Sequence, residues 1–351
     1  MHAWIILSRI ILSISVALQF PEGLLIYSCL ISDILEKYAD CETIIFGDVT
    51  YGACCVDDYT AKILGCDLLI HYGHSCLIPI QDTTGIHLLY IFVTIDINIS
   101  HFMEVIKNNF TTTERLALVS TIQFISSIQS VKSELSQFNY DIFIPQCKPL
   151  SPGEILGCTS PKLPKDISSI IYLGDGRFHL ESIMIQNPTI SAYQYDPYSK
   201  RLSREKYDFN LMVNKRKEAI RVAKIAKSFG LIQGCLGRQG NIRIVEDLES
   251  KLKAANRKTT RILLSEISPE KLVLFDHIDC FVQVACPRLS IDWGDAFFKP
   301  LLSPYELAIA LEYLAFDISN YSMDFYANES SGPWTNNHVT HRPKRTHIKI
   351  V

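Results

Sequence analysis

Apolar, β-rich runs recur along this chain, and each is followed by a loop rich in Gly, Pro, Ser or Cys and then by a helix-like stretch. The runs fall into three sets, which begin near Val16, Leu116 and Gly230. Strands that alternate with helices in this way are typical of βαβ units with parallel sheets. The pattern therefore predicts an α/β protein built from three copies of one small unit.

The length and composition agree with several packed domains. The chain has 351 residues, of which 48% are hydrophobic and 20% are charged, and this balance is ample for packed cores. At roughly 100–200 residues per domain, two or three domains are expected. We place domains at residues 1–110, 111–208 and 209–325, with a turn-rich linker at the end of the second domain. We expect the polar, proline-interrupted stretch at residues 326–351 to be a disordered tail.

The charge pattern and the N-terminal stretch exclude two classes of partner. The formal net charge of −3 provides no long-range field that would collect nucleic acid, so we expect no nucleic-acid binding. A basic amphipathic stretch that ends at Gly230 is interpreted as a solvated helix face. The first 20 residues are apolar, but Arg9 interrupts them, so we interpret their end as a buried strand and expect no membrane span.

The cysteines indicate a reducing compartment. There are 11 of them, an odd number, with no disulfide framework spacing, so we expect a cytoplasmic protein. Each single cysteine is by default a small buried hydrophobe. The densest stretch, residues 47–79, contains the soft ligands Cys54, Cys55, Cys66, Cys76, His71 and His74. None of the usual metal-ligand spacings occurs there, and the two histidines are expected to be hydrogen-bonded core residues more than ligands.

Some cysteines follow the predicted strands at the edge where open parallel sheets bind ligands. Cys54 and Cys55 follow the second strand of the first unit, Cys158 the second strand of the second unit, and Cys286 the third strand of the third unit. Packing of the units around a pseudo-three-fold axis would bring one cysteine from each together. Three thiolates with one open position suit an iron–sulfur cluster whose fourth iron binds substrate, but eleven cysteines allow many such trios.

Several long motifs resemble the diphthamide biosynthesis protein 1 family (2-(3-amino-3-carboxypropyl)histidine synthase subunit 1). The resemblance extends from about residue 16 to 338, and the motifs occur in the order of the family. They are "PEGLLIYSCLISDILEKY", "GDVTYGACCVDDYTAKILGCDLLIHYGHSCLIP", "YLGDGRFHLESIMI", "AYQYDPYSKRLSREKYD", "GCLGRQGN", "LLSEISPEKL", "VQVACPRLSIDWG" and "MDFYANESSGPWTNNH". The hydrophobic stretch Met1–Ser15 departs from the family's amphipathic lead-in.

The resemblance implies three tandem Rossmann-like domains, each of which gives one cysteine to a 4Fe–4S cluster. The implied ligands are Cys54, Cys158 and Cys286, with Cys55 as a neighbour that does not bind iron. The implied activity is an unusual S-adenosylmethionine chemistry. One-electron reduction cleaves the sulfonium on the aminocarboxypropyl side, and the resulting radical adds to the imidazole carbon between the ring nitrogens of a histidine in elongation factor 2. This is the first step of diphthamide synthesis, and it makes the chain a transferase.

Residues for S-adenosylmethionine are expected in four loops at strand ends. An arginine fork could clamp the carboxylate, an aspartate could pair with the ammonium, and backbone N–H groups after glycines could contribute. The candidates are Pro21, Glu22, Gly23, Gly174, Asp175, Gly176, Arg177, Gly237, Arg238, Gln239, Arg288 and Asp292.

The resemblance also implies partners and leaves two alternatives open. It implies a heterodimer with a paralogous second subunit and a small electron-carrier protein. One alternative is a non-catalytic partner subunit of the same complex, and another is a protein that binds zinc through the same thiolates. A simple NAD-binding function is excluded, since no G-x-G-x-x-G follows the first strand.

Overall fold

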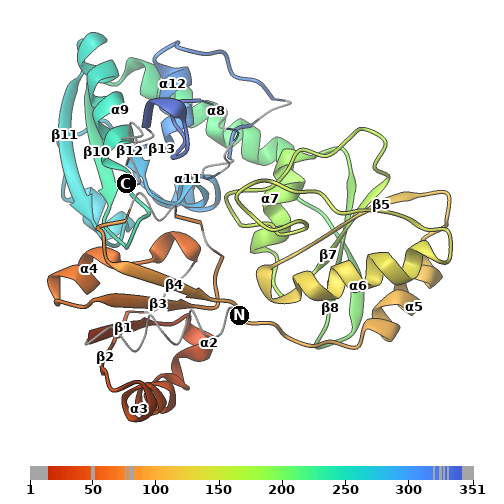
Figure 1. The fold of residues 1–351 in the computed structure, drawn as a ribbon. Helices are drawn as coiled ribbons and strands as arrows, with labels where there is room; N and C mark the ends of the chain where they lie inside the picture. The colour runs from red at the N-terminus through yellow and green to blue at the C-terminus, as the bar shows by residue number, and fades with distance from the viewer. Residues whose placement is uncertain are drawn as a thin grey trace, which may run out of the picture.

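The computed structural model describes residues 15–48, 52–75, 77–78, 83–318, 321–323, 326, 329 and 332–341. It is an α/β protein with three sheets, each in its own lobe (Figure 1). In this view the first lobe is red to orange, the second is yellow to green and the third is teal to blue, and the three meet near the centre. The sequence prediction of three α/β units with mainly parallel sheets is confirmed.

The first sheet is wholly parallel and has the order β2-β1-β3-β4. Its strands are β1 (Ser15–Gln19), β2 (Glu42–Ile45), β3 (Leu68–Tyr72) and β4 (His87–Ile91). The helices of this unit are α2 (Glu22–Leu25), α3 (Ser28–Ala39), α4 (Asp58–Ile63) and the short 3-10 helix η1 (Ala53–Cys55). The strand predicted within the apolar N-terminal stretch is therefore present as β1, whereas residues 1–14 lie outside the described part.

The second sheet has the order β6-β5-β7-β8-β9. Its strands are β5 (Arg115–Ser120), β6 (Asp141–Phe143), β7 (Ser169–Leu173), β8 (Ser191–Asp196) and β9 (Arg201–Glu205). The helices are α5 (Ile99–Asn109), η3 (Ile122–Phe124), α6 (Ile125–Ser136) and α7 (Phe178–Gln186). Strand β9 is antiparallel to β8, so the turn-rich stretch expected to be a linker instead adds an edge strand.

The third sheet is again parallel and has the order β11-β10-β12-β13. Its strands are β10 (Ser228–Gly234), β11 (Lys258–Leu264), β12 (Cys280–Val284) and β13 (Leu301–Leu302). The helices are α8 (Phe209–Ile225), α9 (Ile242–Ala254), α10 (Pro269–Val273), α11 (Pro287–Trp293), η4 (Gly294–Ala296), α12 (Pro304–Ala310) and η5 (Val339–His341). In all three sheets the first strand of the unit lies between its second and third strands, so the unit is repeated at the level of topology.

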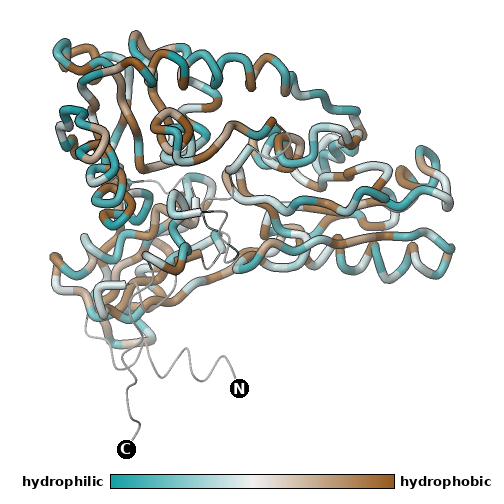
Figure 2. The backbone as a smooth tube through the Cα atoms, turned by 90° about the horizontal axis from the view of Figure 1, so that it is seen from above, coloured by the Kyte–Doolittle hydropathy of each residue, from teal (hydrophilic) through white to brown (hydrophobic). Residues whose placement is uncertain are grey.

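One hydrophobic core connects the three units. Leu69 of β3, Ile185 of α7 and Val282 of β12 belong to the same cluster of buried side chains. In Figure 2 many hydrophobic segments lie toward the inside of the lobes. Burial of apolar area contributes about 25 cal/mol per Å², so this shared core stabilises the arrangement of the lobes as well as each lobe.

Part of the C-terminal stretch, for which the composition predicts a disordered tail, is packed against the rest of the protein. Tyr326 and Thr335, which are 3% and 1% exposed, are buried in the structure, and Trp334 packs against Tyr305 of α12. Aromatic side chains provide enough apolar area to fix such a segment against a domain. Within the described residues, no helix combines the length and the apolar character that a membrane span requires.

Candidate metal centre and the adjoining pocket

The three cysteines singled out in the sequence lie in loops that follow the carboxyl ends of strands. Cys54 lies in η1 after β2, Cys158 lies in the loop after β6, and Cys286 is the N-cap of α11 directly after β12. Parallel sheets place such loops at one edge, and the three lobes meet near α11 (Figure 1). The fold therefore brings together loops that are far apart in sequence.

The thiol groups of these cysteines interact electrostatically. The pKa of the Cys54 thiol is raised, first by a hydrogen bond with Cys55, then by burial, and also by Cys158 and Cys286. Burial and the neighbouring Cys286 raise the pKa of Cys158 to about 12. Buried Tyr326 interacts with all three thiols. Without a metal these thiols are protonated at neutral pH, so a metal group is what would favour their thiolate forms.

The donor arrangement does not suit a single metal ion. Among the residues that the structure describes, no three His, Cys, Asp or Glu side chains are grouped closely enough to hold one ion. A zinc ion with Zn–S bonds of about 2.3 Å needs its sulfurs within roughly 4 Å of one another. In an iron–sulfur cluster each thiolate binds a different iron, so the sulfurs lie farther apart. Three thiol donors from three separate units match the donor set of an iron–sulfur cluster.

The other cysteines of the first unit have structural surroundings. Cys55 is 1% exposed, its carbonyl accepts a hydrogen bond from Gln19 Nε2 at 2.9 Å, and its sulfur accepts one from Gln239 Nε2 at 3.5 Å. Cys66 is buried and accepts a hydrogen bond from Ser15 Oγ. Cys76 lies outside the described residues. The described neighbours thus behave as packing residues.

His71 is a core residue. Its side chain is fully buried, and its Nδ1 lies 2.8 Å from Gln19 Oε1. Burial, helped by the nearby His74, lowers the pKa of His71 to about 3, so its ring is neutral at physiological pH. Burial also lowers the pKa of His74. The surroundings of His71 agree with the expectation of a hydrogen-bonded core histidine, whereas His74 is only half-buried.

The loop "GRQG" lies against the turn that carries Cys54. The backbone N–H of Arg238 donates to the carbonyl of Cys54 at 2.9 Å. Gly237 has a φ of +52°, and a Cβ at this position would lie 2.5 Å from the carbonyl carbon of Cys55. Only glycine combines this left-handed conformation with such a close approach. The third unit is therefore held directly on the first unit at the cysteine turn.

Gly237→Ala is expected to separate these loops. The strained conformation costs about 1–3 kcal/mol, and the new methyl group must displace the backbone of Cys55. We expect a lower melting temperature and weaker iron binding after anaerobic reconstitution. Gly176→Ala is a matched control, because Gly176 also has a positive φ of +65° but a Cβ there meets nothing within 4 Å. Equal iron content in the wild type and in Gly237→Ala would show that iron binding does not depend on the close contact between Gly237 and the Cys55 backbone.

Arg238 is held by the first unit. Its Nε and Nη2 donate to the two carboxylate oxygens of Asp58 at 2.6 Å each, and its Nη1 donates to the Tyr59 hydroxyl at 2.7 Å. Its guanidinium also lies 3.9 Å from the centre of the Tyr59 ring. Asp58 is fully buried, and its pKa is lowered because the bonds from Arg238 and Thr84 outweigh the effect of burial.

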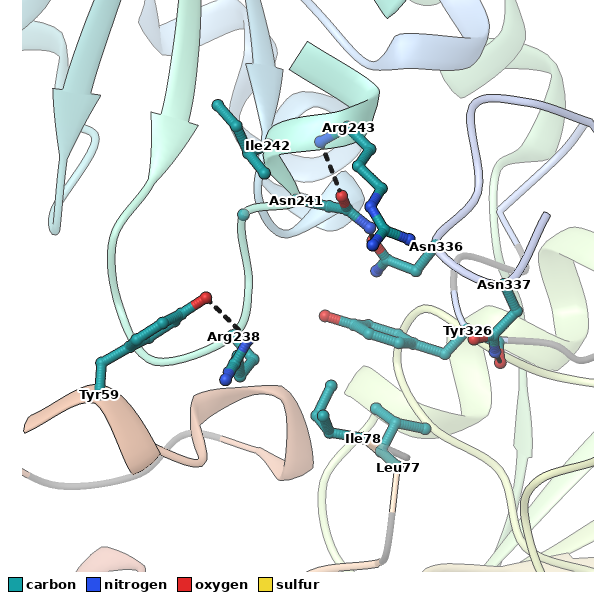
Figure 3. Close-up of a pocket in the computed structure, with 11 residues that line it drawn as sticks. Tyr59, Leu77, Ile78, Arg238, Asn241, Ile242, Arg243, Tyr326, Asn336 and Asn337 are labelled. Carbon is teal, nitrogen blue, oxygen red and sulfur yellow. Dashed lines mark hydrogen bonds between the residues drawn. The ribbon is translucent and has the colours of Figure 1, made fainter. Parts of the chain in front are cut away.

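A cavity of about 250 Å³ adjoins this contact. Figure 3 shows Tyr59 and Arg238 on one side and Tyr326 reaching in from the other. The described lining residues are Tyr59, Leu77, Ile78, Arg238, Gly240, Asn241, Ile242, Arg243, Tyr326, Asn336 and Asn337. Asn241 Nδ2 donates to Asn336 Oδ1 at 3.0 Å, which ties the C-terminal stretch to the start of α9. Since Tyr326 also interacts with the three thiols, the cavity lies beside the candidate metal centre.

The remaining predicted cofactor-binding residues do not line this cavity. Glu22 and Gly23 are exposed at the start of α2, and Pro21 packs beneath Gly73. In the loop from Gly174 to Arg177, Gly174 is buried and Asp175 and Gly176 are exposed. Arg177 is paired with Glu205 and Glu181. Arg288 and Asp292 are paired with each other.

Sequence reasoning missed most of the cavity lining. Asn241, Arg243, Asn336 and Tyr326 were not singled out. The signal that could have found Asn241 is its place before a periodic apolar stretch, since Asn is a preferred N-cap and its side chain accepts a bond from the Arg243 N–H at the start of α9.

The chain resembles known proteins over nearly its whole length. A family model described as "Putative diphthamide synthesis protein" matches residues 20–322. The 2-(3-amino-3-carboxypropyl)histidine synthase subunit 1 of Caenorhabditis elegans is 61% identical over 336 residues, which are 94% of this chain and 84% of that protein. The protein of the same name from Homo sapiens is 58% identical over 325 residues, which are 92% of this chain and 74% of that protein.

A solved structure has the same fold. It is Dph2 from Pyrococcus horikoshii with a 4Fe-4S cluster, with a TM-score of 0.75 and 27% sequence identity. The match covers 95% of this chain and 96% of the Pyrococcus chain. The lobes and their arrangement are therefore shared with a protein that carries an iron–sulfur cluster.

Proposed function

Because the chain belongs to the diphthamide synthesis protein family, we propose that it is a transferase that catalyses the first step of diphthamide biosynthesis. The relatives above are named as subunit 1 of the enzyme that forms 2-(3-amino-3-carboxypropyl)histidine. In finer terms, the proposed reaction is radical transfer of the 3-amino-3-carboxypropyl group from S-adenosylmethionine to an imidazole carbon of a histidine in elongation factor 2.

The observation that carries this proposal is the meeting of three interacting thiols from three separate units. Cys54, Cys158 and Cys286 would hold a 4Fe–4S cluster and leave one iron without a protein ligand, and the similarity to Dph2 with its cluster supports this assignment. Such a cluster supplies one electron for cleavage of the sulfonium. The chain's part is to hold the cluster at the edge of the shared core, against which Cys54 and Cys158 pack.

The cavity beside the thiols is our candidate for the S-adenosylmethionine site. The Arg243 guanidinium would attract the carboxylate of the ligand, whereas Arg238 is already paired with Asp58. Its apolar and aromatic walls, from Leu77, Ile78 and Tyr326, would contact the nucleoside. Holding the ligand here would orient one C–S bond toward the cysteines, which is the positioning on which regioselective cleavage depends.

Arg243→Gln is expected to weaken S-adenosylmethionine binding. Loss of a charge-assisted hydrogen bond costs about 1.5–3 kcal/mol, which raises the dissociation constant by roughly tenfold or more. Binding can be measured by calorimetry on the anaerobic protein. Arg221→Gln is the control, since Arg221 forms an exposed pair with Glu218 on α8. If both variants bind S-adenosylmethionine as the wild type does, the ligand lies elsewhere.

The proposed partners are those that membership of the family implies. Elongation factor 2 would be the protein substrate that carries the histidine, and a small carrier protein would supply the electron. A paralogous second subunit would complete a heterodimer. We propose that these interactions take place in the cytoplasm, where the many free cysteines stay reduced.

The first experiment is an anaerobic absorption spectrum of the chain purified with its partner subunit. A broad band near the blue end of the visible spectrum that bleaches with dithionite, with about four irons per chain, is expected. Addition of S-adenosylmethionine and elongation factor 2 should then modify the histidine. A colourless protein that carries zinc, or no metal after reconstitution, would overturn the catalytic proposal and favour a structural partner subunit.

A further inference from the structure

Arg288 links the loops that carry two of the three cysteines. It lies two residues after Cys286 in α11 and is 2% exposed. Its Nη1 donates to the carbonyl of Gly157, the residue before Cys158, at 3.3 Å, and to the carbonyl of Phe178 at 2.7 Å. One side chain of the third unit thus fixes the loop of the second unit on which Cys158 lies.

The same guanidinium is surrounded by compensating groups. Its Nη2 pairs with Glu181 at 2.5 Å, and its Nε lies 2.9 Å and 3.0 Å from the carboxylate oxygens of Asp292. The central guanidinium carbon, Cζ, lies 4.4 Å from the centre of the Phe178 ring. A buried charge persists only when it is paired in this way. All three guanidinium nitrogens are used within the protein, so Arg288 acts on the site through the loops and through its charge.

The packing around this contact is close. A Cβ at Gly157 would lie 2.0 Å from Cε1 of Phe178, so the ring rests directly on the loop before Cys158. Arg288 interacts favourably with the thiolate forms of both Cys158 and Cys286, whereas Asp292 opposes the thiolate of Cys286. The cation and its carboxylates therefore form a fixed set of charges next to two of the cysteines.

We propose that Arg288 is a positioning residue that fixes the positions of Cys158 and Cys286 relative to each other. We also propose that Arg288 and Asp292 together set the reduction potential of the bound cluster. This inference rests on the proposed function, because it requires that the cysteines hold a cluster. Reduction adds a negative charge to a group already bound by thiolates. A buried cation stabilises the reduced form, and a nearby carboxylate destabilises it, since both act through a low local dielectric.

The test is an anaerobic redox titration of the full chain, reconstituted with iron and sulfide and followed by electron paramagnetic resonance. At a fixed solution potential, Arg288→Gln should lower the ratio of reduced to oxidised cluster about tenfold, equivalent to about 59 mV for one electron. Asp292→Asn should change the ratio in the opposite direction. Arg288→Lys, which keeps the charge, should lie closer to the wild type than Arg288→Gln does.

Arg261→Gln is the matched control. Arg261 is paired with Glu249 in the same unit but is 43% exposed, so solvent screens its charge and the potential should not change. If Arg288→Gln binds no cluster, Asp292→Asn decides the inference. It must raise the ratio of reduced to oxidised cluster relative to the wild type. Unchanged potentials in Asp292→Asn and in every loaded Arg288 variant would overturn it. Failure of the wild type to bind iron would instead overturn the proposed function.

Discussion

Cys158→Ala is expected to remove both the iron and the transferase activity of this protein. Cys158 is one of the three thiols that interact at the meeting point of the lobes. Loss of even an outer-shell partner of a metal ligand costs about 10–100-fold, so removal of a ligand should lower the activity by more than about 100-fold. Iron and sulfide analysis after anaerobic reconstitution measures the first effect, and modification of elongation factor 2 measures the second.

Cys66→Ala is the matched control for this prediction. Cys66 is also a buried cysteine of a parallel α/β unit, but it packs in the core and accepts a hydrogen bond from Ser15 Oγ. Its removal should cost about 1 kcal/mol of stability, as is usual for a single substitution, and should leave the iron content unchanged. Equal loss of iron in both variants would show that the proposed trio of ligands is wrong.

The fold could be predicted from local patterns. Runs such as that from Leu116 to Ser120, which are buried along almost their whole length, are apolar because a parallel strand is covered on both faces. Helix α9 is amphipathic, with Ile244 and Leu248 on the buried side. These patterns depend on neighbours in the sequence, so they can be recognised without the tertiary structure.

The cysteine loops could be placed only in part. Their positions after strands follow from the sequence, and in the structure Cys158 and Cys286 contribute to the raised pKa of the Cys54 thiol. The choice of Cys54, Cys158 and Cys286 from eleven cysteines came from resemblance to a family, since spacing could not exclude other trios. The assignment of these three as cluster ligands stays a prediction until iron binding is measured.

The pocket could not be predicted, because its walls come from distant segments. Arg238 meets Asp58 across 180 positions of sequence, and Asn336 approaches Asn241 across 95 positions. The stretch that contains Asn336 is polar and interrupted by proline, so its composition resembles a disordered tail. It is ordered by contacts such as that of Trp334 with Tyr305, which no local pattern reveals.

Glu306→Ala is expected to produce the largest loss of stability. Glu306 is fully buried in α12, where its carboxylate accepts hydrogen bonds from Arg216 Nε at 2.6 Å and from Arg216 Nη2 at 2.7 Å. The Tyr321 hydroxyl donates to it at 2.8 Å. Removal of one partner leaves a buried guanidinium without its counter-charge, which costs about 3–5 kcal/mol. Calorimetry should show a melting temperature lower by about 10 °C.

The same substitution should also weaken the metal centre. Arg216 Nη1 donates to the carbonyl of Ser290 at 2.7 Å, and Ser290 lies in α11, the helix that begins after Cys286. An uncompensated Arg216 would shift toward water and release this helix. We therefore expect Glu306→Ala to bind less iron than the wild type even at temperatures where it remains folded.

The double variant Arg216→Met/Glu306→Leu tests whether the unpaired charge of Arg216 causes the loss of stability in Glu306→Ala. Replacement of a whole buried pair by apolar residues is often neutral, so this variant should recover most of the stability lost in Glu306→Ala. Glu218→Ala, which breaks the exposed pair with Arg221, should leave the melting temperature unchanged. A double variant as unstable as Glu306→Ala would show that the hydrogen bonds to Ser290 and Tyr321, which the double variant also lacks, determine the loss rather than the unpaired charge.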